Sequence, residues 1–231
     1  VFPLFWPYGE TAKGYREDGY YPEAFVNMLA LLGWNPGTEQ ELFSMDELIE
    51  AFSIERVGKS GSRFDPEKAK WFNHQYLQKR SNNQLAIEFR EFLRARGFFV
   101  DIVELEILIG LVKERVSFVK DIWDQTDFFF KAPETYDPEV IKKRWKEDSA
   151  ILLTGLRNEL EKIDDFSSVS AEPVIKAWIE KNGYSNGTIM NAFRLVIVGA
   201  SRGPHMLDII EWIGKDETLS RIDRGLSVIG K

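Results

Sequence analysis

The stretch Ile107–Phe130, ILIGLVKERVSFVKDIWDQTDFFF, organises the middle of the chain. Its apolar residues recur at steps of three and four, the period of one face of an α-helix. One row comprises Leu108, Val112, Val116, Val119 and Trp123. A second row comprises Leu111, Phe118 and Ile122, and Arg115 falls inside it. The period predicts a buried helix in which Arg115 either reaches water from the edge of the core or serves as a recognition group.

The composition predicts an ordered chain with a hydrophobic core. Of 231 residues, 44% are hydrophobic and 29% are charged, and no apolar run reaches transmembrane length. The first residues lack a basic leader and a small-residue cleavage site, so we expect no signal peptide. The chain has no cysteine, which excludes disulfides and thiolate metal sites and suits a reducing compartment.

The net charge of −7 argues against a general phosphate binder, although a shape-specific partner depends only on the local field. Basic residues do cluster between positions 56 and 70, at Arg56, Lys59, Arg63, Lys68 and Lys70. From charge alone, a solvated surface explains this cluster better than a binding site.

Helix signals recur along the chain. Two capping boxes, beginning at Ser44 and Ser81, and Asp65-Pro66 each predict the start of a helix. Glycines such as Gly214 predict helix ends. The last third reads as short helices over about Pro138–Glu147, Ser149–Ile163, Ala171–Lys181, Asn186–Val198, Pro204–Ile213 and Glu217–Ile229. We therefore predict an all-α fold with a little sheet near the N-terminus, after a proline-rich and aromatic lead-in over residues 1–18.

The sequence offers little for catalysis. Only two histidines are present, so a histidine metal site or two-histidine catalysis is not expected. His74 reads as a structural side chain, and the carboxylates read as solvated. The aromatic residues expected in the core are Trp71, Phe72, Phe128 and Phe129. On these observations the chain is a binding or architectural module without an active site.

Four stretches in order resemble bacterial-type glutamyl-tRNA synthetases downstream of their catalytic core. They are GYYPEAFVNMLALLGWNPG at Gly19–Gly37, FSMDELIEAFSIERV and FDPEKAKWFNHQY within Phe43–Tyr76, LVKERVSFVKDIWDQTDFFF at Leu111–Phe130, and FRLVIVGASRGPHMLDIIEWIGKDETLSRIDRGL at Phe193–Leu226. The likeness runs from about residue 14 to the end of the chain. The His-x-Gly-His and Lys-x-Ser-Lys motifs of the family's ATP site do not occur in it.

The resemblance implies the tRNA-binding part of such an enzyme, with tRNA(Glu) as partner. It implies a stem-contact region remnant over 1–78, followed by helix-bundle or α-helix-cage anticodon-binding subdomains over 79–134 and 135–231. We expect no cofactor in this chain, since ATP with Mg would bind to the parent enzyme's catalytic domain. The parent would attach glutamate to tRNA using ATP, whereas this chain alone would be catalytically inactive. A cytoplasmic monomer without membrane contact is expected.

The resemblance also assigns site residues. Arg115 falls on an arginine that reads the third anticodon base, a task suited to a rigid fork of donors that keeps its charge. Arg194 falls on an arginine at the first anticodon base, and Gly203, Pro204 and Met206 match the loop around that base. Arg202 and His205 depart from the family's commonest pattern. Possible phosphate contacts are Lys113, Arg56, Lys59 and Arg63.

Two alternatives remain open from the sequence. One is a helical protein-interaction module that does not bind RNA. The other is a related synthetase that charges both glutamate and glutamine tRNAs. A steep loss of affinity with rising salt distinguishes an RNA binder from an apolar protein interface.

Overall fold

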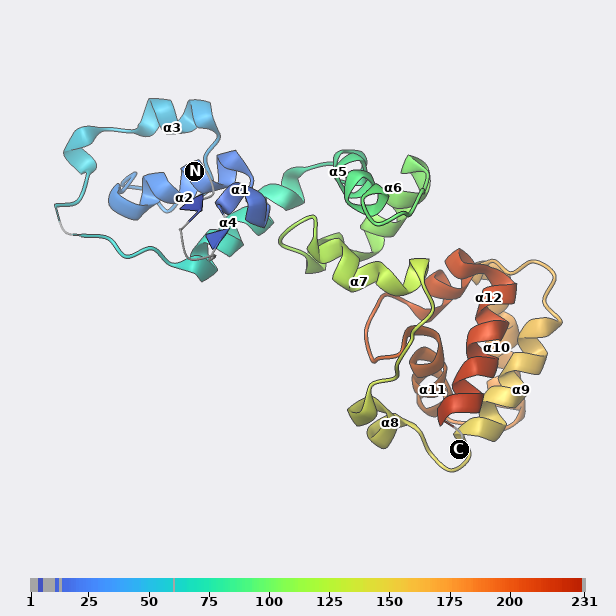
Figure 1. Cartoon of the computed structure of the whole chain (residues 1–231). Coiled ribbons are helices and arrows are strands. Elements are labelled where there is room, and N and C mark those ends of the chain that lie inside the picture. Colours follow the sequence, from blue (N-terminus) through green and yellow to red (C-terminus); the bar gives the residue numbers. More distant parts are fainter. Residues whose placement is uncertain (1–3, 6–10, 13, 60, 230–231) are drawn as a thin grey trace. The chain divides into compact units, whose positions relative to one another are not determined.

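The computed structural model describes residues 4–5, 11–12, 14–59 and 61–229, so the lead-in residues 1–3, 6–10 and 13 lie outside the described part. The chain divides into two compact units, Val1–Asp124 (unit 1) and Gln125–Lys231 (unit 2). Helices dominate both units, and the one ladder of strands in the described residues is short, which confirms the predicted all-α fold (Figure 1). This two-way division does not test the three predicted domain ranges, which stay a prediction.

Unit 1 opens with two short antiparallel strands that pair Leu4 with Ala12 and Phe5 with Thr11. Its elements are β1 Leu4–Phe5, β2 Thr11–Ala12, α1 Tyr15–Asp18, α2 Pro22–Gly33, α3 Met45–Ala51, the 3₁₀-helix η1 Ile54–Arg56, α4 Pro66–Lys79, α5 Asn82–Arg94, α6 Ile102–Val112, the 3₁₀-helix η2 Lys113–Arg115 and α7 Asp121–Phe130. The end of unit 1 falls within α7. The strands confirm the predicted small sheet near the N-terminus.

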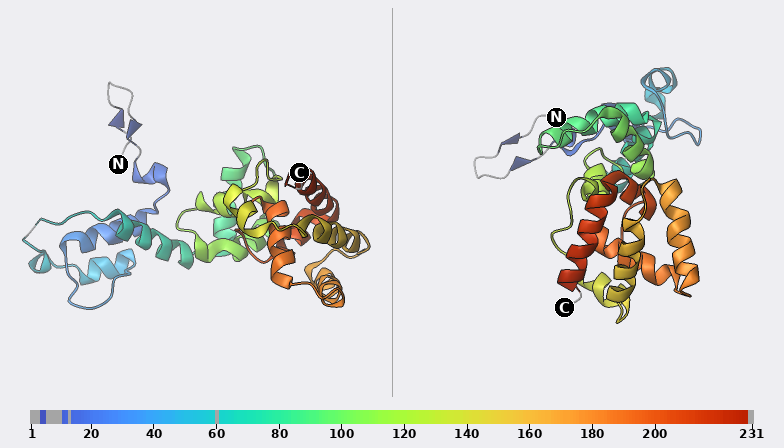
Figure 2. Two further views of the ribbon diagram at one scale, coloured as in Figure 1. Left: turned by 90° about the horizontal axis from the view of Figure 1, so that it is seen from below. Right: turned by 90° about the vertical axis from the view of Figure 1, so that its right-hand side faces the viewer.

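Two helix pairs build the core of unit 1. Helix α2 packs on α4, and α5 packs on α6 (Figures 1 and 2). The buried side chains of α4, α5 and α6 include Phe72, Leu77, Leu85, Phe89, Leu93, Leu105, Leu108 and Ile109. Phe72 is fully buried as predicted, whereas Trp71 remains 39% exposed, so its predicted place in the core is wrong. Adjacent helical residues point about 100° apart, and α4 turns Phe72 inward and Trp71 toward solvent.

Local signals determine several helix starts in unit 1. The Ser44 and Ser81 hydroxyls accept the N–H groups of Glu47 and Gln84, whose side chains bond back to the capping residues, so both predicted capping boxes are confirmed. The Asp65 carboxylate accepts the N–H of Glu67 at 2.9 Å, and Pro66 begins α4. Each cap pairs groups only two or three residues apart.

The predicted continuous helix through Ile107–Phe130 is wrong. Helix α6 ends at Val112, a single 3₁₀ turn follows, and Val116 is extended, with φ −118° and ψ 144°. Val116 and Phe118 are nevertheless buried, although they belong to a turn and not to a helix face. This is why the spacing of apolar residues resembles that of a helix. The Asp121 carboxylate accepts the N–H groups of Ser117 and Phe118, at 3.1 and 2.9 Å, and so satisfies donors that a helix would have used.

Unit 2 is built around one central helix, α11 (Asn186–Val198), most of whose faces are buried. Its elements after α7 are α8 Pro138–Arg144, α9 Ser149–Glu161, α10 Ser168–Lys181, α11 Asn186–Val198 and α12 Met206–Ile229. Helix α11 packs against α8, α9 and α12, and α10 packs against α9 and α12 (Figure 2). The helices predicted in the last third of the sequence therefore occur in the predicted order. Helix α10 begins earlier than predicted because the Ser167 hydroxyl caps it.

Gly214 breaks α12 into two helical segments, as the sequence predicts. Its φ of 78° and ψ of 171° are not helical. A positive φ is strained for residues with a Cβ, so glycine suits this position. Of the other predicted core aromatics, Phe128 and Phe129 are buried in unit 2 as expected.

Candidate nucleic-acid interface

Arg115 ends the 3₁₀ turn that follows α6, and its side chain is exposed. The turn is short and well anchored: the N–H of Val116 donates to the carbonyl of Lys113 at 3.3 Å, and Val116 and Phe118 are buried on either side of Ser117. The arginine therefore projects from a turn whose neighbours lie in the core. This differs from the predicted position on a helical stripe, because Arg115 is an exposed residue at the end of a turn.

Side chains of α4 hold the turn from one side. The Asn73 amide donates to the Ser117 carbonyl at 2.6 Å, and the Gln78 amide donates to the Lys113 carbonyl at 2.7 Å. His74 Nδ1 lies 2.8 Å from the Val116 carbonyl, and because a carbonyl only accepts, Nδ1 carries the hydrogen. His74 is thus a structural hydrogen-bond donor.

Lys113, a predicted phosphate contact, is partly buried, and its ammonium donates to the Arg80 carbonyl. Arg80 caps the C-terminal end of α4, where the carbonyls of a helix carry partial negative charge. The Lys113 ammonium therefore offsets the partial negative charge at the end of this helix, two positions before Arg115 in the sequence. Its role toward phosphate stays a prediction.

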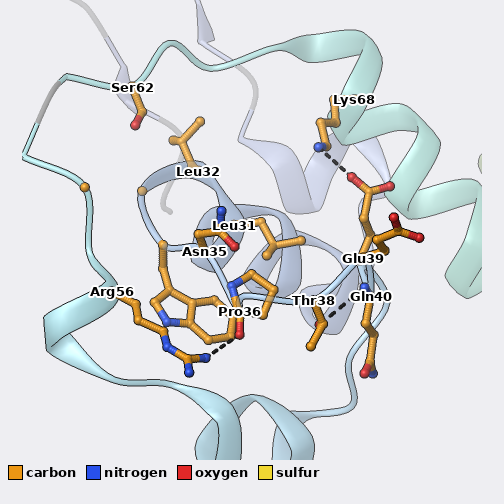
Figure 3. Close-up of a pocket in the computed structure, with 14 residues that line it drawn as sticks. Leu31, Leu32, Asn35, Pro36, Thr38, Glu39, Gln40, Arg56, Ser62 and Lys68 are labelled. Carbon is orange, nitrogen blue, oxygen red and sulfur yellow. Dashed lines mark hydrogen bonds and ion pairs between the residues drawn. The ribbon is translucent and has the colours of Figure 1, made fainter.

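The other predicted phosphate contacts, Arg56, Lys59 and Arg63, are exposed on the connection between α3 and α4. Arg56 Nη1 donates to the Pro36 carbonyl and borders a hollow of about 490 Å³ (Figure 3). Lys68 lies across this hollow and pairs with Glu41 at 2.9 Å. Two glutamates, Glu39 and Glu41, line the same hollow, so it is not a purely cationic cradle for an anion.

In unit 2, Arg194 organises the loop between α11 and α12. Its Nη1 donates to the Arg202 carbonyl at 2.9 Å and its Nη2 donates to the Pro204 carbonyl at 2.8 Å. Gly203 lies between these two acceptors with φ 101°, and a Cβ there would lie 2.8 Å from Cζ of Phe128. Both its backbone conformation and its surroundings therefore require glycine.

Arg194 and Met206 line a common hollow of about 340 Å³ with His205, while Pro204 in the same loop is buried. The structure thus brings together the residues predicted around the first anticodon base. It adds lining residues that the sequence analysis missed: Glu172, Ile175, Lys176, Asn186, Gly187, Met190, Asn191 and Leu207. Met190 and Asn191 precede Arg194 by four and three positions, so a helical period applied to Arg194 could have identified them.

Charged partners surround this hollow and its loop. The Lys176 ammonium donates to Glu172 at 2.6 Å, and this bond holds the pKa of the Glu172 carboxyl below its usual range. Arg202 pairs with Asp127 at 2.6 Å and lies 5.1 Å from the centre of the Phe128 ring. Arg202 therefore stabilises the loop as an ion-pair partner, which gives a structural reason for its presence.

The described residues contain no group of three or more His, Cys, Asp or Glu side chains that could hold a metal ion. Within the described part of the chain, no helix combines the length and apolarity needed to cross a membrane.

Comparisons with known proteins agree on one family. A family model described as "Anticodon binding domain" matches residues 68–226, and one described as "tRNA synthetases class I (E and Q), catalytic domain" matches residues 9–71. The second match falls on the range predicted as a stem-contact region. A glutamate–tRNA ligase of Porphyromonas gingivalis (strain ATCC BAA-308 / W83) is 52% identical over 233 residues, covering 100% of this chain and 46% of the relative.

A glutamate–tRNA ligase of Flavobacterium johnsoniae is 50% identical over 230 residues, covering 99% of this chain and 46% of the relative. Among solved structures, a glutamate tRNA ligase from Elizabethkingia meningosepticum CCUG26117, in complex with its amino acid, matches with a TM-score of 0.91 and 43% identity. That match covers 99% of this chain and 46% of the solved chain. The chain thus spans less than half the length of these relatives.

Proposed function

Since this chain belongs to the anticodon-binding domain family, we propose that it binds the anticodon loop of a glutamate tRNA as part of a glutamate–tRNA ligase. The observation that carries the proposal is Arg115, an exposed arginine on a turn whose carbonyls on both sides are held by α4. The family match disfavours the alternative of a protein-interaction module without RNA binding.

Arg115 would read the third anticodon base. By the genetic code that base is cytosine in glutamate tRNAs and guanine in glutamine tRNAs. The Watson–Crick edge of cytosine presents two adjacent acceptors, N3 and O2, to which a guanidinium can donate two hydrogen bonds. Guanine presents N–H donors at the corresponding positions, and these would face the donors of the arginine. Arg115 therefore supplies a chemical reason to prefer cytosine.

The hollow bounded by Arg194, His205 and Met206 would receive the first anticodon base. Arg194 is proposed to act there both as a contact and through the loop, because its two bonds to that loop fix the backbone of Gly203 and Pro204. The apolar Met206 side chain would offer the base a surface for packing.

Arg56, Lys59, Arg63 and Lys113 are proposed as phosphate contacts, which set the register of the RNA without reading sequence. Replacing an exposed member of this set with alanine should weaken binding to all hairpins alike and lower its salt dependence.

Attachment of glutamate would require the catalytic region of the longer ligase, to which ATP and magnesium would bind. The His-x-Gly-His and Lys-x-Ser-Lys motifs of that site are absent from this sequence. We therefore assign this chain no chemical step, and expect no charged tRNA when it is mixed with glutamate, ATP and tRNA. We propose that the ligase acts in the cytoplasm as a monomer.

The test compares binding of this chain to two anticodon stem-loop RNAs that differ only in the third base, cytosine or guanine. Arg115→Ala should lower the preference for cytosine by about 1–3 kcal/mol, the scale of one lost bidentate base contact. Arg94→Ala, which removes another exposed arginine from unit 1, is the matched control and should leave the preference unchanged.

Two results would argue against this proposal. If Arg115→Ala kept the wild-type preference, Arg115 would have a structural role. If the wild-type chain bound both hairpins equally, the chain would instead suit a ligase that accepts both glutamate and glutamine tRNAs.

A further inference from the structure

We propose that helix α4 positions Arg115 for base reading through three polar side chains, Asn73, His74 and Gln78, here called the α4 clamp. The inference rests on the proposed reading of the third anticodon base by Arg115. It adds three positioning residues that lie about forty positions away in sequence, and it links the start of α2 to the same turn.

The clamp grips the turn on both sides of Arg115. Gln78 donates to the carbonyl of Lys113, which precedes Arg115, and His74 and Asn73 donate to the carbonyls of Val116 and Ser117, which follow it. The three distances lie between 2.6 and 2.8 Å. Fixing carbonyls on both sides restricts the backbone from which the arginine projects.

The clamp residues share one side of α4. At about 100° per residue, positions 73, 74 and 78 fall within a sector of about 140°. The apolar residues Phe72 and Leu77 supply the buried contacts of the same helix. Phe72 and Leu77 thus supply apolar packing for α4, whereas the clamp residues supply the polar contacts to the turn.

Asn73 also ties the turn to α2. Its side chain is fully buried, its amide donates to the Ser117 carbonyl, and its Oδ1 accepts the N–H of Tyr21 at 2.7 Å. Tyr21 precedes the first residue of α2. Since both ends of the amide are used, the orientation of Asn73 is determined, and α2, α4 and the Arg115 turn share one hydrogen-bonded junction.

A positioned arginine discriminates better than a mobile one. An arginine side chain that must be ordered on binding loses rotamer freedom, and a loose backbone adds to that loss and lets the fork meet the wrong base edge. Weakening the clamp should therefore lower the ratio of affinities for the cytosine and guanine hairpins, with little change in the melting temperature.

The principal test uses Gln78→Glu, which keeps the shape of the side chain but replaces the donating amide with a carboxylate. Gln75→Glu is the matched control, because it introduces the same charge on the same helix at a side chain that is half-buried, as Gln78 is. Binding of this chain to the cytosine and guanine hairpins, and the melting temperature, are measured for each variant. Gln78→Glu should reduce the preference for cytosine roughly two- to tenfold, the effect of one hydrogen bond, whereas Gln75→Glu should not.

His74 provides a second pair of variants should Gln78→Glu fail to fold. His74→Leu removes the donor and should reduce the preference, whereas His74→Asn can place an amide N–H near the Nδ1 position and should restore part of it. A role in stability alone would change the melting temperature and the affinity for both hairpins without changing their ratio.

A double substitution separates the clamp from the reading of the base. In the Arg115→Ala background, Gln78→Glu should have no further effect on the preference, because the clamp acts through Arg115. Additive effects would overturn the inference, as would an unchanged preference in Gln78→Glu and His74→Leu while Arg115→Ala loses it. If Arg115→Ala itself kept the preference, the proposed function would fail first, and the clamp would lose its role with it.

Discussion

The guanidinium of Arg221 is buried in unit 2 and donates hydrogen bonds to the C-terminal ends of two helices. The residue is 3% exposed, and its Nη1 donates to the carbonyls of Phe128 at 2.6 Å and Ile197 at 3.1 Å. Phe128 lies in the last turn of α7 and Ile197 in the last turn of α11, where carbonyls have no partner within their own helix. Arg221 thus supplies donors that two helix ends lack.

We expect Arg221→Met to destabilise unit 2 by about 2–4 kcal/mol. Each buried carbonyl left without a donor costs about 1–3 kcal/mol, and burial of the methionine side chain offsets part of the loss. Glu217, whose carboxylate accepts from Arg221 Nε at 2.7 Å, is 41% exposed at its side chain and can turn to water, so it adds little.

Urea unfolding of the chain measures this loss, and amide hydrogen exchange assigns it to a unit. Exchange should accelerate in α11 and α12 and stay unchanged in α4 and α5. Arg224→Met is the control, since it removes an exposed arginine from the same helix and should change stability by less than about 0.5 kcal/mol. Equal effects of the two variants would refute the double helix-capping role of Arg221.

Three further predictions concern packing, capping and pH. Gly225→Ala should destabilise unit 2 by about 1–3 kcal/mol, because the new Cβ would lie 2.6 Å from Cβ of Val196, as urea unfolding can show. Ser81→Ala should destabilise unit 1 by about 0.5–2 kcal/mol through loss of the cap on α5, read from the same measurement. Burial, followed by the nearby Glu88 carboxylate, raises the pKa of Tyr21, so the folded chain keeps this proton where an unfolded tyrosine, with a pKa of about 10, loses it. The contribution of Tyr21 to stability should therefore be fully present below about pH 10 and be lost as the pH rises above it. Tyr21→Phe should lessen the fall in urea midpoint between about pH 9 and pH 11.

Matched variants check these three expectations. Gly33→Ala adds a Cβ in α2 with no heavy atom within 4 Å, so it should be neutral or slightly stabilising, and an equal loss in both glycine variants would contradict the packing argument. Ser220→Ala removes an exposed hydroxyl from α12 and should change stability little. An alkaline slope that stayed the same in Tyr21→Phe would show that Tyr21 titrates alike in the folded and unfolded chain.

Sequence alone determined features that depend on neighbouring residues. The caps at Ser44 and Ser81, the break at Gly214 and the order of the helices were predicted because each involves groups only a few positions apart. The importance of Arg115 could be proposed from the family resemblance and from its misfit with an apolar row. The spacing of the apolar residues around Arg115 did not reveal the turn, because buried residues in a turn and in a helix can follow the same spacing.

Tertiary structure decided how the candidate site is held. The hydrogen bonds from Asn73, His74 and Gln78 to the turn join residues separated by 44, 42 and 35 positions, and Arg221 reaches Phe128 across 93 positions. No local propensity specifies such pairs, because they depend on which helices pack together and in which register. The exposure of Trp71 and the burial of Phe72 follow from the same packing. The sequence therefore suggested Arg115 as a candidate recognition residue, and the fold supplied the hydrogen bonds that hold its turn in place.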